Sequence, residues 1–368
     1  VSWSRILPDG TEKINQKGIE FYQSLVRELK AAGIEPMVTL YHWDLPYALY
    51  LQGGWKNPQI PDWFAAYTKI VVEALSDQVQ YWMTLNEPQC FVGIGHLQGR
   101  HAPFLDEPAS LRPVTRHVLL AHAKAVQTIR QYAKLPPKVG YAPTGPVFSP
   151  CGDESEAAIA EAYRRTMEVE GCYSISWWCD PVLLGRVPEP MAKALGADVF
   201  TPQELELLHQ PLDYLGFNVY NACAAQQPGS EYTANTWQGS PRTAMEWPIT
   251  PDCIYWAIRF LNQRYGRPIL ITENGMANTD FVMLDGKVHD PQRIDYVHRH
   301  LLAARRALQE GYPLIGYTYW SIMDNYEWAE GYSKRFGLIY VDYRTMERIP
   351  KDSAAWYAHV IATNGSEL

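Results

Sequence analysis

Apolar positions along the chain follow two alternating spacings. In some segments they recur every three or four residues, as on one face of an amphipathic helix, and short apolar runs typical of buried strands lie between them. The helical spacing predicts helices at about residues 19–29, 63–75, 114–132, 252–265 and 292–310. The apolar runs predict strands in "PMVTLYHWDLP", "YWMTLNEP", "KVGYAPTG", "LDYLGFNVY", "PILITENG" and "PLIGYTYWSIMD".

Two helix ends carry local signals of their own. Gly33 follows the first predicted helix and is expected to end it. Thr201 precedes a proline and Glu204, the pattern of a capping box with proline at the first helical position. A further short helix is therefore predicted ahead of "LDYLGFNVY".

The regular exchange of helix and strand predicts parallel strands that are buried on both faces. Such strands form either an open, doubly wound sheet or a β/α barrel. An open nucleotide-binding sheet would show a glycine-rich turn after its first strand, and the sequence has none. A barrel instead places functional groups at the carboxyl ends of several strands.

Polar side chains do gather where the predicted strands end. Charged groups there are costly unless they are paired or used, and five clusters in succession are hard to explain by stability alone. The pattern therefore favours the barrel. The clusters are His42, Trp43 and Asp44; Asn86 and Glu87; Asn218 and Tyr220; Glu273 and Asn274; and Trp320, Asp324, Asn325, Glu327 and Trp328.

Two of these residues, Glu87 and Glu273, suggest a reaction. Each alone is slightly better explained as a member of a buried ion pair. Together, in a chain with 13 Trp and 24 Tyr, they suit glycoside hydrolysis, in which one carboxyl protonates the leaving oxygen and the other attacks or activates water. Pro88 disfavours the helical conformation at Glu87, so an extended Glu87 is expected.

Other chemistries have weaker support in the sequence. His42 and Asp44 could bind a metal, but no second histidine follows at the fourth position and no H-E-x-x-H motif is present. His96 and His122 are interpreted as core or surface histidines. A serine hydrolase would need a G-x-S-x-G turn, which the chain lacks. We expect neither a metal nor a cofactor.

Composition narrows the class of protein further. The chain has 368 residues, is 47% hydrophobic and carries a net charge of −8, so it can bury a large core. An acidic chain without basic runs is not expected to bind nucleic acid or an anionic membrane, and no apolar stretch approaches the ~20 residues of a membrane span. The six cysteines form no C-x-x-C pair, which predicts free, buried thiols and a reducing, cytoplasmic location.

Several longer motifs resemble those of the glycoside hydrolase family 1 β-glucosidases. They are "VSWSRILPDG", "YHWDLP", "GGWKN", "TLNEP", "LGFNVY", "ITENG", "YTYWSIMDNYEW" and "GYSKRFGLIYVDY". The resemblance covers nearly the whole chain. It implies a (β/α)8 TIM barrel and a retaining hydrolysis of terminal β-D-glucosyl residues through a covalent glycosyl-enzyme.

The resemblance also implies roles for individual residues. Glu87 corresponds to the general acid/base and Glu273 to the nucleophile. Tyr220 corresponds to the tyrosine that hydrogen-bonds the nucleophile and keeps the pKa of its carboxyl low, and Asn218 to a residue that supports the site. Two glutamates in a retaining enzyme are expected to lie about 5–5.5 Å apart.

The sugar-binding residues are implied in the same way. Asn86 matches the residue that binds the 2-hydroxyl, and His42 and Trp43 resemble glycone-pocket residues. Trp320 matches the platform under the sugar ring. The pair expected to reach the 4- and 6-hydroxyls is Glu327 and Trp328.

The expected substrate is a small β-glucoside or a cello-oligosaccharide. Glu327 would repel a 6-phosphate, which disfavours a phospho-β-glucosidase. The family's thioglucosidases carry glutamine at the position of Glu87, so O-glycosides are preferred. Glu327 can bond an equatorial or an axial 4-hydroxyl, which leaves glucose, galactose and fucose open, as is the aglycone. Phe104 replaces the family's usual glycine after "AP" and is expected to reshape the aglycone entrance.

The largest departure from the family pattern lies at the start of the chain. Aligned by its motifs, "VSWSR" should be the second barrel strand, so residues 1–368 are expected to form one barrel domain with seven strands that lacks the first β/α unit. The family's glutamine ligand for the 3- and 4-hydroxyls and the arginine beneath the nucleophile would be absent. A gene fragment, an incomplete sequence, and a shortened enzyme completed by homo-oligomerisation all fit this pattern.

Two other functions stay open at this point. A sugar-binding pseudoenzyme, or an incomplete barrel with little turnover, fits the absent first strand, although both glutamates are kept. Transglycosylation, in which an acceptor other than water resolves the intermediate, is permitted by the aromatic content.

Overall fold

The computed structural model describes residues 1–225 and 239–368, and these residues fall into two compact units. The first unit comprises residues 1–145 and 167–216. The second comprises residues 146–166 and 217–368. None of the helices among the described residues is long and apolar enough to cross a membrane.

The first unit is built on a parallel sheet with the strand order β1-β2-β3. Its strands are β1 (Met37–Tyr41), β2 (Tyr81–Asn86) and β3 (Lys138–Ala142). Each lies within a run predicted to be a strand, and both pairings are parallel, as expected. Neighbours pair with both edges of central strand β2, and its Trp82 and Leu85 have no exposed surface.

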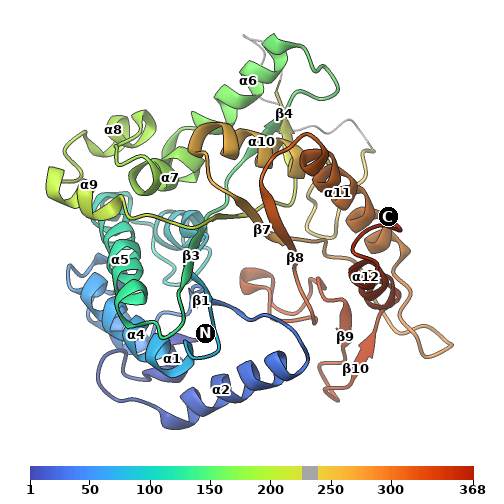
Figure 1. Cartoon of the computed structure of the whole chain (residues 1–368), viewed down its shortest axis with the longest axis horizontal. Helices are drawn as coiled ribbons and strands as arrows, with labels where there is room; N and C mark the ends of the chain where they lie inside the picture. The colour runs from blue at the N-terminus through green and yellow to red at the C-terminus, as the bar shows by residue number, and fades with distance from the viewer. Residues whose placement is uncertain (226–238) are drawn as a thin grey trace. The chain divides into compact units, whose positions relative to one another are not determined.

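A helix precedes each of these strands, at the predicted positions. These helices are α2 (Gln16–Ala31), α4 (Ile60–Leu75) and α5 (Leu111–Tyr132), and α4 and α5 lie side by side (Figure 1). The apolar face of α4 is buried through Phe64 and Val71, and that of α5 through Val118 and Val126. This burial explains why the three-to-four spacing of the sequence identified both helices.

One strand prediction is wrong. The segment "VSWSR" was expected to be a strand, but Trp3–Ile6 form the short helix α1, whose first turn is capped by the Ser2 hydroxyl. Only the ammonium group of Val1 makes a strand-like contact, donating to the carbonyl oxygen of Thr39 in β1 at 2.7 Å. The buried ring of Trp3 stacks on Tyr67 of α4, so packing against a helix determines this segment.

The remaining elements of the first unit are short. The predicted helix after Thr201 is present, and its capping box is complete because the Thr201 hydroxyl and the Glu204 carboxylate each accept a backbone N–H. These elements are α3 (Tyr47–Leu51), α7 (Ile175–Leu183), α8 (Glu189–Leu195) and α9 (Pro202–Leu208), the 3₁₀ helices η1 (Gly54–Lys56), η3 (Pro108–Ser110) and η4 (Gly171–Tyr173), and the π-helix η2 (Gln89–Leu97).

The second unit contains a sheet with the order β5-β7-β8. Its strands are β5 (Leu215–Asn218), of which the last two residues belong to this unit, β7 (Ile269–Asn274) and β8 (Leu314–Tyr319). Strands β7 and β8 pair in parallel and run side by side in Figure 1. Burial on both faces holds for β7, where Ile269 and Leu270 point to opposite faces and are both buried, but not for edge strand β8, where Ile315 is 52% exposed.

Helices and two smaller sheets complete the second unit. Strands β4 (Val147–Ser149) and β6 (Ala222–Ala224) pair in parallel, and β9 (Ile339–Val341) and β10 (Arg348–Pro350) pair antiparallel. The predicted helices α10 (Cys253–Tyr265) and α11 (Pro291–Gln309) are confirmed to within one residue at each end. The other elements are α6 (Glu156–Met167), α12 (Asp352–Ala362) and the 3₁₀ helix η5 (Trp328–Glu330).

The α/β alternation predicted from the sequence is thus present in both units. All six cysteines are present as thiols and not as disulfides. Cys172, Cys179 and Cys253 are buried as expected, whereas Cys151 is exposed.

Candidate functional site

The polar residues predicted at strand ends lie at strand ends. Asn86 is the last residue of β2, and Asn218 is the last residue of β5. Glu273 and Asn274 close β7, while Trp320 follows β8 directly. His42 likewise follows the last residue of β1.

In the first unit, three predicted residues form a hydrogen-bonded group. The indole Nε1 of Trp43 donates to the backbone carbonyl of Asn86 at 2.9 Å, and Nδ2 of Asn86 lies 3.2 Å from Nε2 of His42. Burial lowers the pKa of His42 to about 4, so its imidazole is neutral near pH 7. A neutral Nε2 can accept from the Asn86 amide, which fixes the orientation of that side chain.

Glu87 follows this group and is 7% exposed. The expectation of an extended conformation is wrong: Glu87 has φ +43°, in the left-handed region. Its N–H donates to the carbonyl of Ala142 at the end of β3, at 2.8 Å, and Pro88 already has helical angles as the residue before η2. The local preference imposed by Pro88 is therefore outweighed by the turn from β2 into this helix.

Cys90 was not identified from the sequence as part of the site. Its thiol donates to Oε2 of Glu87 at 3.1 Å, and its backbone N–H donates to the carbonyl of Glu87 at 2.9 Å. The signal that could have found it is its spacing, because a residue three positions after Glu87 faces back toward it once the chain turns helical.

In the second unit, Tyr220 and Glu273 are in direct contact. The Tyr220 hydroxyl donates to Oε2 of Glu273 at 2.6 Å. Tyr296 of α11 donates its own hydroxyl to the carbonyl of Tyr220 at 2.8 Å, and the ring of Trp247 lies 5.1 Å from the Tyr220 ring. Neither Tyr296 nor Trp247 was predicted. Together they fix the position from which Tyr220 reaches the carboxylate.

The neighbours of Glu273 in β7 hold the strand end in place. Thr272 donates its hydroxyl to Oδ1 of Asn218 at 2.5 Å, and Asn274 donates its amide to the carbonyl of Val219 at 2.7 Å. The backbone N–H of Val219 in turn donates to the carbonyl of Glu273 at 3.0 Å. Asn218 is thus tied to the strand that carries Glu273.

The segment after β8 carries Trp320, Glu327 and Trp328, and it begins close to β7. The N–H of Trp320 donates to the carbonyl of Asn274 at 2.9 Å. A Cβ atom on Gly275 would lie 2.1 Å from the carbonyl oxygen of Trp320, so only glycine allows this approach. Farther along, the N–H of Glu327 donates to the carbonyl of Gly331 at 2.7 Å.

A row of charges of alternating sign anchors the same segment. It runs from Asp290 through Arg293, Asp280, Lys351 and Asp324 to Arg335. The first five side chains have no exposed surface, and Arg335 is 16% exposed. Both oxygens of Asp324 are used, with Lys351 Nζ at 2.9 Å from one and the Arg335 guanidinium at 2.6 Å from the other. Three anions and three cations balance, so each buried charge is paired.

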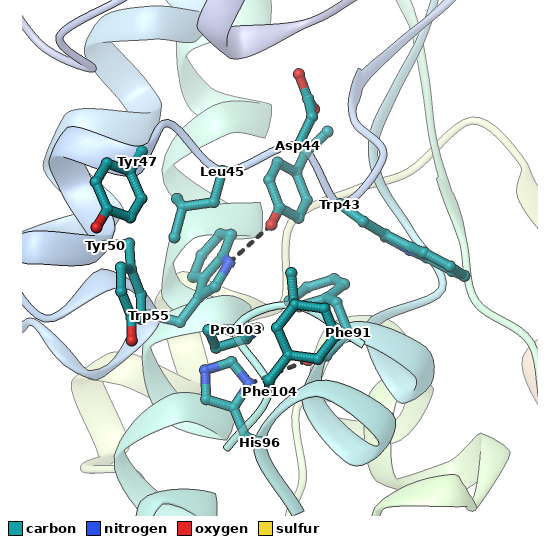
Figure 2. Close-up of a pocket in the computed structure, with 12 residues that line it drawn as sticks. Trp43, Asp44, Leu45, Tyr47, Tyr50, Trp55, Phe91, His96, Pro103 and Phe104 are labelled. Carbon is teal, nitrogen blue, oxygen red and sulfur yellow. Dashed lines mark hydrogen bonds between the residues drawn. The ribbon is translucent and has the colours of Figure 1, made fainter. Parts of the chain in front are cut away.

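An apolar cavity of about 290 Å³ opens beside Trp43 in the first unit (Figure 2). Rings line most of it, and Phe104, Tyr47 and Tyr50 are the exposed ones, at 67%, 70% and 38%. The indole of Trp55 donates to the Tyr41 hydroxyl at 3.1 Å on the inner wall. Phe104, the departure seen in the sequence, thus borders a ring-lined space that also reaches Trp43.

The two histidines interpreted as core or surface residues, His96 and His122, are core residues of the first unit. Nδ1 of His96 lies 3.0 Å from the carbonyl of Phe91, and Nδ1 of His122 lies 2.7 Å from the Thr84 hydroxyl. Across residues 1–225 and 239–368, no group of three or more His, Cys, Asp or Glu side chains is arranged to hold a metal ion.

Comparison with known proteins places these residues in context. The family model described as glycosyl hydrolase family 1 matches residues 1–366. β-Glucosidase A of Thermotoga maritima is 41% identical and is aligned over 100% of this chain and 82% of its own length. A 1,4-β-D-glucan glucohydrolase of Thermotoga neapolitana is also 41% identical, over 99% of this chain and 82% of that protein.

A solved structure is similar over the same extent. The β-glucosidase from Thermotoga maritima in complex with deoxynojirimycin matches with a TM-score of 0.89 and 40% identity. The match covers 99% of this chain and 82% of that one.

Proposed function

Because the chain belongs to glycosyl hydrolase family 1, we propose that it is a retaining β-glucosidase. It would remove terminal β-D-glucosyl residues from cello-oligosaccharides or from aryl and alkyl β-glucosides, within one β/α-barrel catalytic domain spanning residues 1–368. The observation that carries the proposal is the 2.6 Å hydrogen bond from Tyr220 to Glu273. A hydroxyl aimed at a strand-end carboxylate stabilises its charged form, which is the form that can act as a nucleophile.

In the first step, a carboxylate oxygen of Glu273 attacks the anomeric carbon. The bond between that carbon and the glycosidic oxygen breaks, and the proton of the Glu87 carboxyl moves to the leaving oxygen. The products are the free aglycone alcohol, a glycosyl ester on Glu273 and an ionised Glu87. This step requires the two carboxyl groups to flank one glycosidic bond, about 5–5.5 Å apart.

In the second step, Glu87 acts as a base. It removes a proton from water while the water oxygen attacks the anomeric carbon, and the ester bond to Glu273 breaks. Glucose leaves with its β configuration kept, and both carboxyl groups return to their starting protonation. An acceptor alcohol in place of water would give transglycosylation by the same bond changes.

We assign sugar recognition to Asn86 with its two neighbours and to residues of the segment after β8. Asn86, held by His42 and Trp43, would bond the 2-hydroxyl, where hydrogen bonds strengthen in the transition state. Trp320 would stack under the sugar ring, and Glu327 with Trp328 would bind the 4- and 6-hydroxyls. Asn218 would act through its contact with Thr272 and would not touch the sugar.

The preferred substrates follow from charge and from the apolar cavity. Glu327 would repel a 6-phosphate, which argues for unphosphorylated sugars. Glu87, where thioglucosidases carry glutamine, supplies the acid that an O-glycoside needs. An aryl or alkyl aglycone suits the ring-lined cavity bordered by Trp43 and Phe104.

Hydrolysis of an aryl β-glucoside tests the proposal directly. Wild-type protein should release the phenol and Glu273→Ala should not. Incubation with a 2-deoxy-2-fluoro-β-glucoside that carries a good leaving group should add one fluoroglucosyl unit, and peptide mapping should place it on Glu273. Sugar binding without release would favour a pseudoenzyme. Full release by Glu273→Ala, or a first-formed α-glucose product in NMR spectra, would contradict the mechanism.

A further inference from the structure

The thiol of Cys90 contacts the carboxyl group of Glu87, the candidate acid/base. Cys90 is the second residue of η2, and its Sγ donates to Oε2 of Glu87 at 3.1 Å. Glu87 is 7% exposed, so the contact is made where water competes weakly for the carboxyl oxygen. This contact has no role in the reaction steps proposed above.

The backbone on both sides of the contact is fixed. The N–H of Glu87 is bonded to Ala142 in β3, and the N–H of Cys90 is bonded to the carbonyl of Glu87. Helix η2 itself lies close to η4, because a Cβ atom on Gly93 would lie 2.6 Å from the ring of Tyr173. The thiol is therefore held on a short turn whose ends cannot shift independently of the sheet.

We propose that Cys90 is a positioning residue for the acid/base: its thiol holds one carboxyl oxygen of Glu87 so that the other is presented to the leaving oxygen. This inference rests on the proposed function for its catalytic meaning. A general acid must lie within hydrogen-bond reach of the oxygen that it protonates, so a carboxyl that rotates freely loses efficiency.

A thiol suits this position better than a hydroxyl would. The S–H group is a weak donor, so it orients the carboxyl while stabilising the charged form only slightly. A serine hydroxyl at the same place would favour the ionised carboxylate more strongly. The acid must keep its proton until the glycosidic bond breaks, and a weak donor interferes least with that requirement.

Other titratable groups bear on the test and must be held constant. His42 contacts Asn86, the residue before Glu87, and Tyr173 packs against η2 from η4. Glu273 is the second carboxyl group of the proposed mechanism. Substitutions at position 90 leave all three in place, so differences among such variants report the thiol contact.

The leaving-group dependence of the rate separates positioning from general damage. We expect Cys90→Ala to lower kcat/KM about fivefold to tenfold with an alkyl β-glucoside, whose leaving group needs a proton. With 2,4-dinitrophenyl β-glucoside, whose leaving group needs none, the loss should stay within about twofold. Cys90→Ser should restore most of the alkyl glucoside activity. The exposed Cys151→Ser serves as the control and should change neither rate.

The pH profile supplies a second readout. The basic limb of kcat/KM reports loss of the acid's proton in the free enzyme. Cys90→Ser should move this limb to lower pH and Cys90→Ala to higher pH, by about half a unit each. Substitutions that only disturb packing would lower the rate without moving the limb in opposite directions.

A labelling experiment tests the contact without relying on activity. A neighbouring carboxylate disfavours the thiolate, which is the form that reacts with iodoacetamide. In a Cys151→Ser background, Glu87→Gln should therefore speed alkylation of Cys90 severalfold, as measured by peptide mass spectrometry. Alkylation of the partly exposed Cys223 should be unchanged.

The outcomes are distinguishable. Coupled labelling in an inactive wild-type protein would support the contact and remove the proposed function. An active enzyme with uncoupled labelling, or with equal losses for both substrates and no shift of the basic limb, would overturn the positioning role of Cys90.

Discussion

The hydroxyl of Tyr220 donates a 2.6 Å hydrogen bond to Oε2 of Glu273, and Tyr296 anchors the backbone of Tyr220 from α11. A carboxylate at the end of a buried strand is thus paired with a neutral donor that stabilises its charge without neutralising it. A donor at this position favours the ionised form of a carboxylate, which is the form that the proposed nucleophile needs.

Tyr220→Phe should remove this donor and leave the ring packing in place. A hydrogen bond to a charged group contributes about 1.5–3 kcal/mol, so we expect kcat/KM to fall about 10-fold to 150-fold. The acidic limb of the pH profile should move to higher pH, because the carboxylate loses a donor to its charged form. Tyr163→Phe, a substitution in α6 of the same unit, is the matched control. An unmoved acidic limb would mean that Tyr220 does not act on the nucleophile.

Asn86→Ala tests the 2-hydroxyl assignment. If the Asn86 amide bonds that hydroxyl in the transition state, the variant should lose about 10-fold to 100-fold in kcat/KM with an aryl β-glucoside. With the corresponding 2-deoxyglucoside, wild type and variant should hydrolyse at similar rates, because the substrate has no group to lose. Equal losses with both substrates would show instead that the Asn86 side chain acts by holding His42, since the bond from Trp43 is made to the Asn86 backbone and stays in the variant.

The buried charge row predicts a large stability effect at Lys351. Lys351→Met would remove the ammonium group that lies 2.6 Å from Asp280 and 2.9 Å from Asp324. The buried row would then hold three anions and two cations. Breaking a buried ion pair by removing one partner costs about 3–5 kcal/mol, and we expect the free energy of unfolding in urea to fall by that amount. Arg344→Gln removes a pair in which the arginine side chain is 89% exposed and should leave the free energy of unfolding nearly unchanged. Similar small losses in both variants would contradict the role assigned to the row.

Much of the fold could be predicted because its signals are local. The apolar spacing of α4 and α11 matches the one face of each helix that is buried. The apolar runs of β2 and β7 match strands that are buried on both faces. Strands β4 and β6 are three residues long, too short for any periodicity to be recognised. The strand predicted around Trp3 was wrong for a different reason. The apolar residues of this segment pack on α4, and a run of four residues is too short to show whether they belong to a helix or a strand.

Some residues of the candidate site could likewise be predicted from the sequence, and others could not. Glu87, Asn86 and Glu273 could be identified because polar groups at the ends of apolar runs are conspicuous in a sequence. The residues that hold them could not. Tyr296 contacts Tyr220 from 76 positions away, and no local pattern predicts such a pairing. The left-handed backbone of Glu87 was missed because its cause is a hydrogen bond to Ala142, a residue far along the chain.

His122 of α5 contacts the strand that carries Asn86, and we expect it to make the protein less stable in acid. Its Nδ1 lies 2.7 Å from the Thr84 hydroxyl, it is fully buried, and burial lowers the pKa of His122 to about 3. In the unfolded chain the same histidine takes up a proton near its ordinary pKa of 6.5. Between these two values the unfolded state binds one more proton than the folded state, so stability is lost as the pH falls through this window.

His122→Gln should therefore flatten the acid side of the stability curve. Each proton of difference contributes a slope of about 1.4 kcal/mol per pH unit, so between about pH 6 and pH 4 the variant should lose less stability than wild type by that slope. Urea unfolding at pH 6, 5 and 4 measures it, with His209→Gln, at an exposed position of the same unit, expected to keep the full wild-type slope. The variant will be less stable than wild type at pH 7 if glutamine packs poorly against Tyr141, whose ring lies 4.7 Å from the imidazole, but this offset does not depend on pH. Parallel curves for His122→Gln and wild type would show that His122 is not the group that titrates.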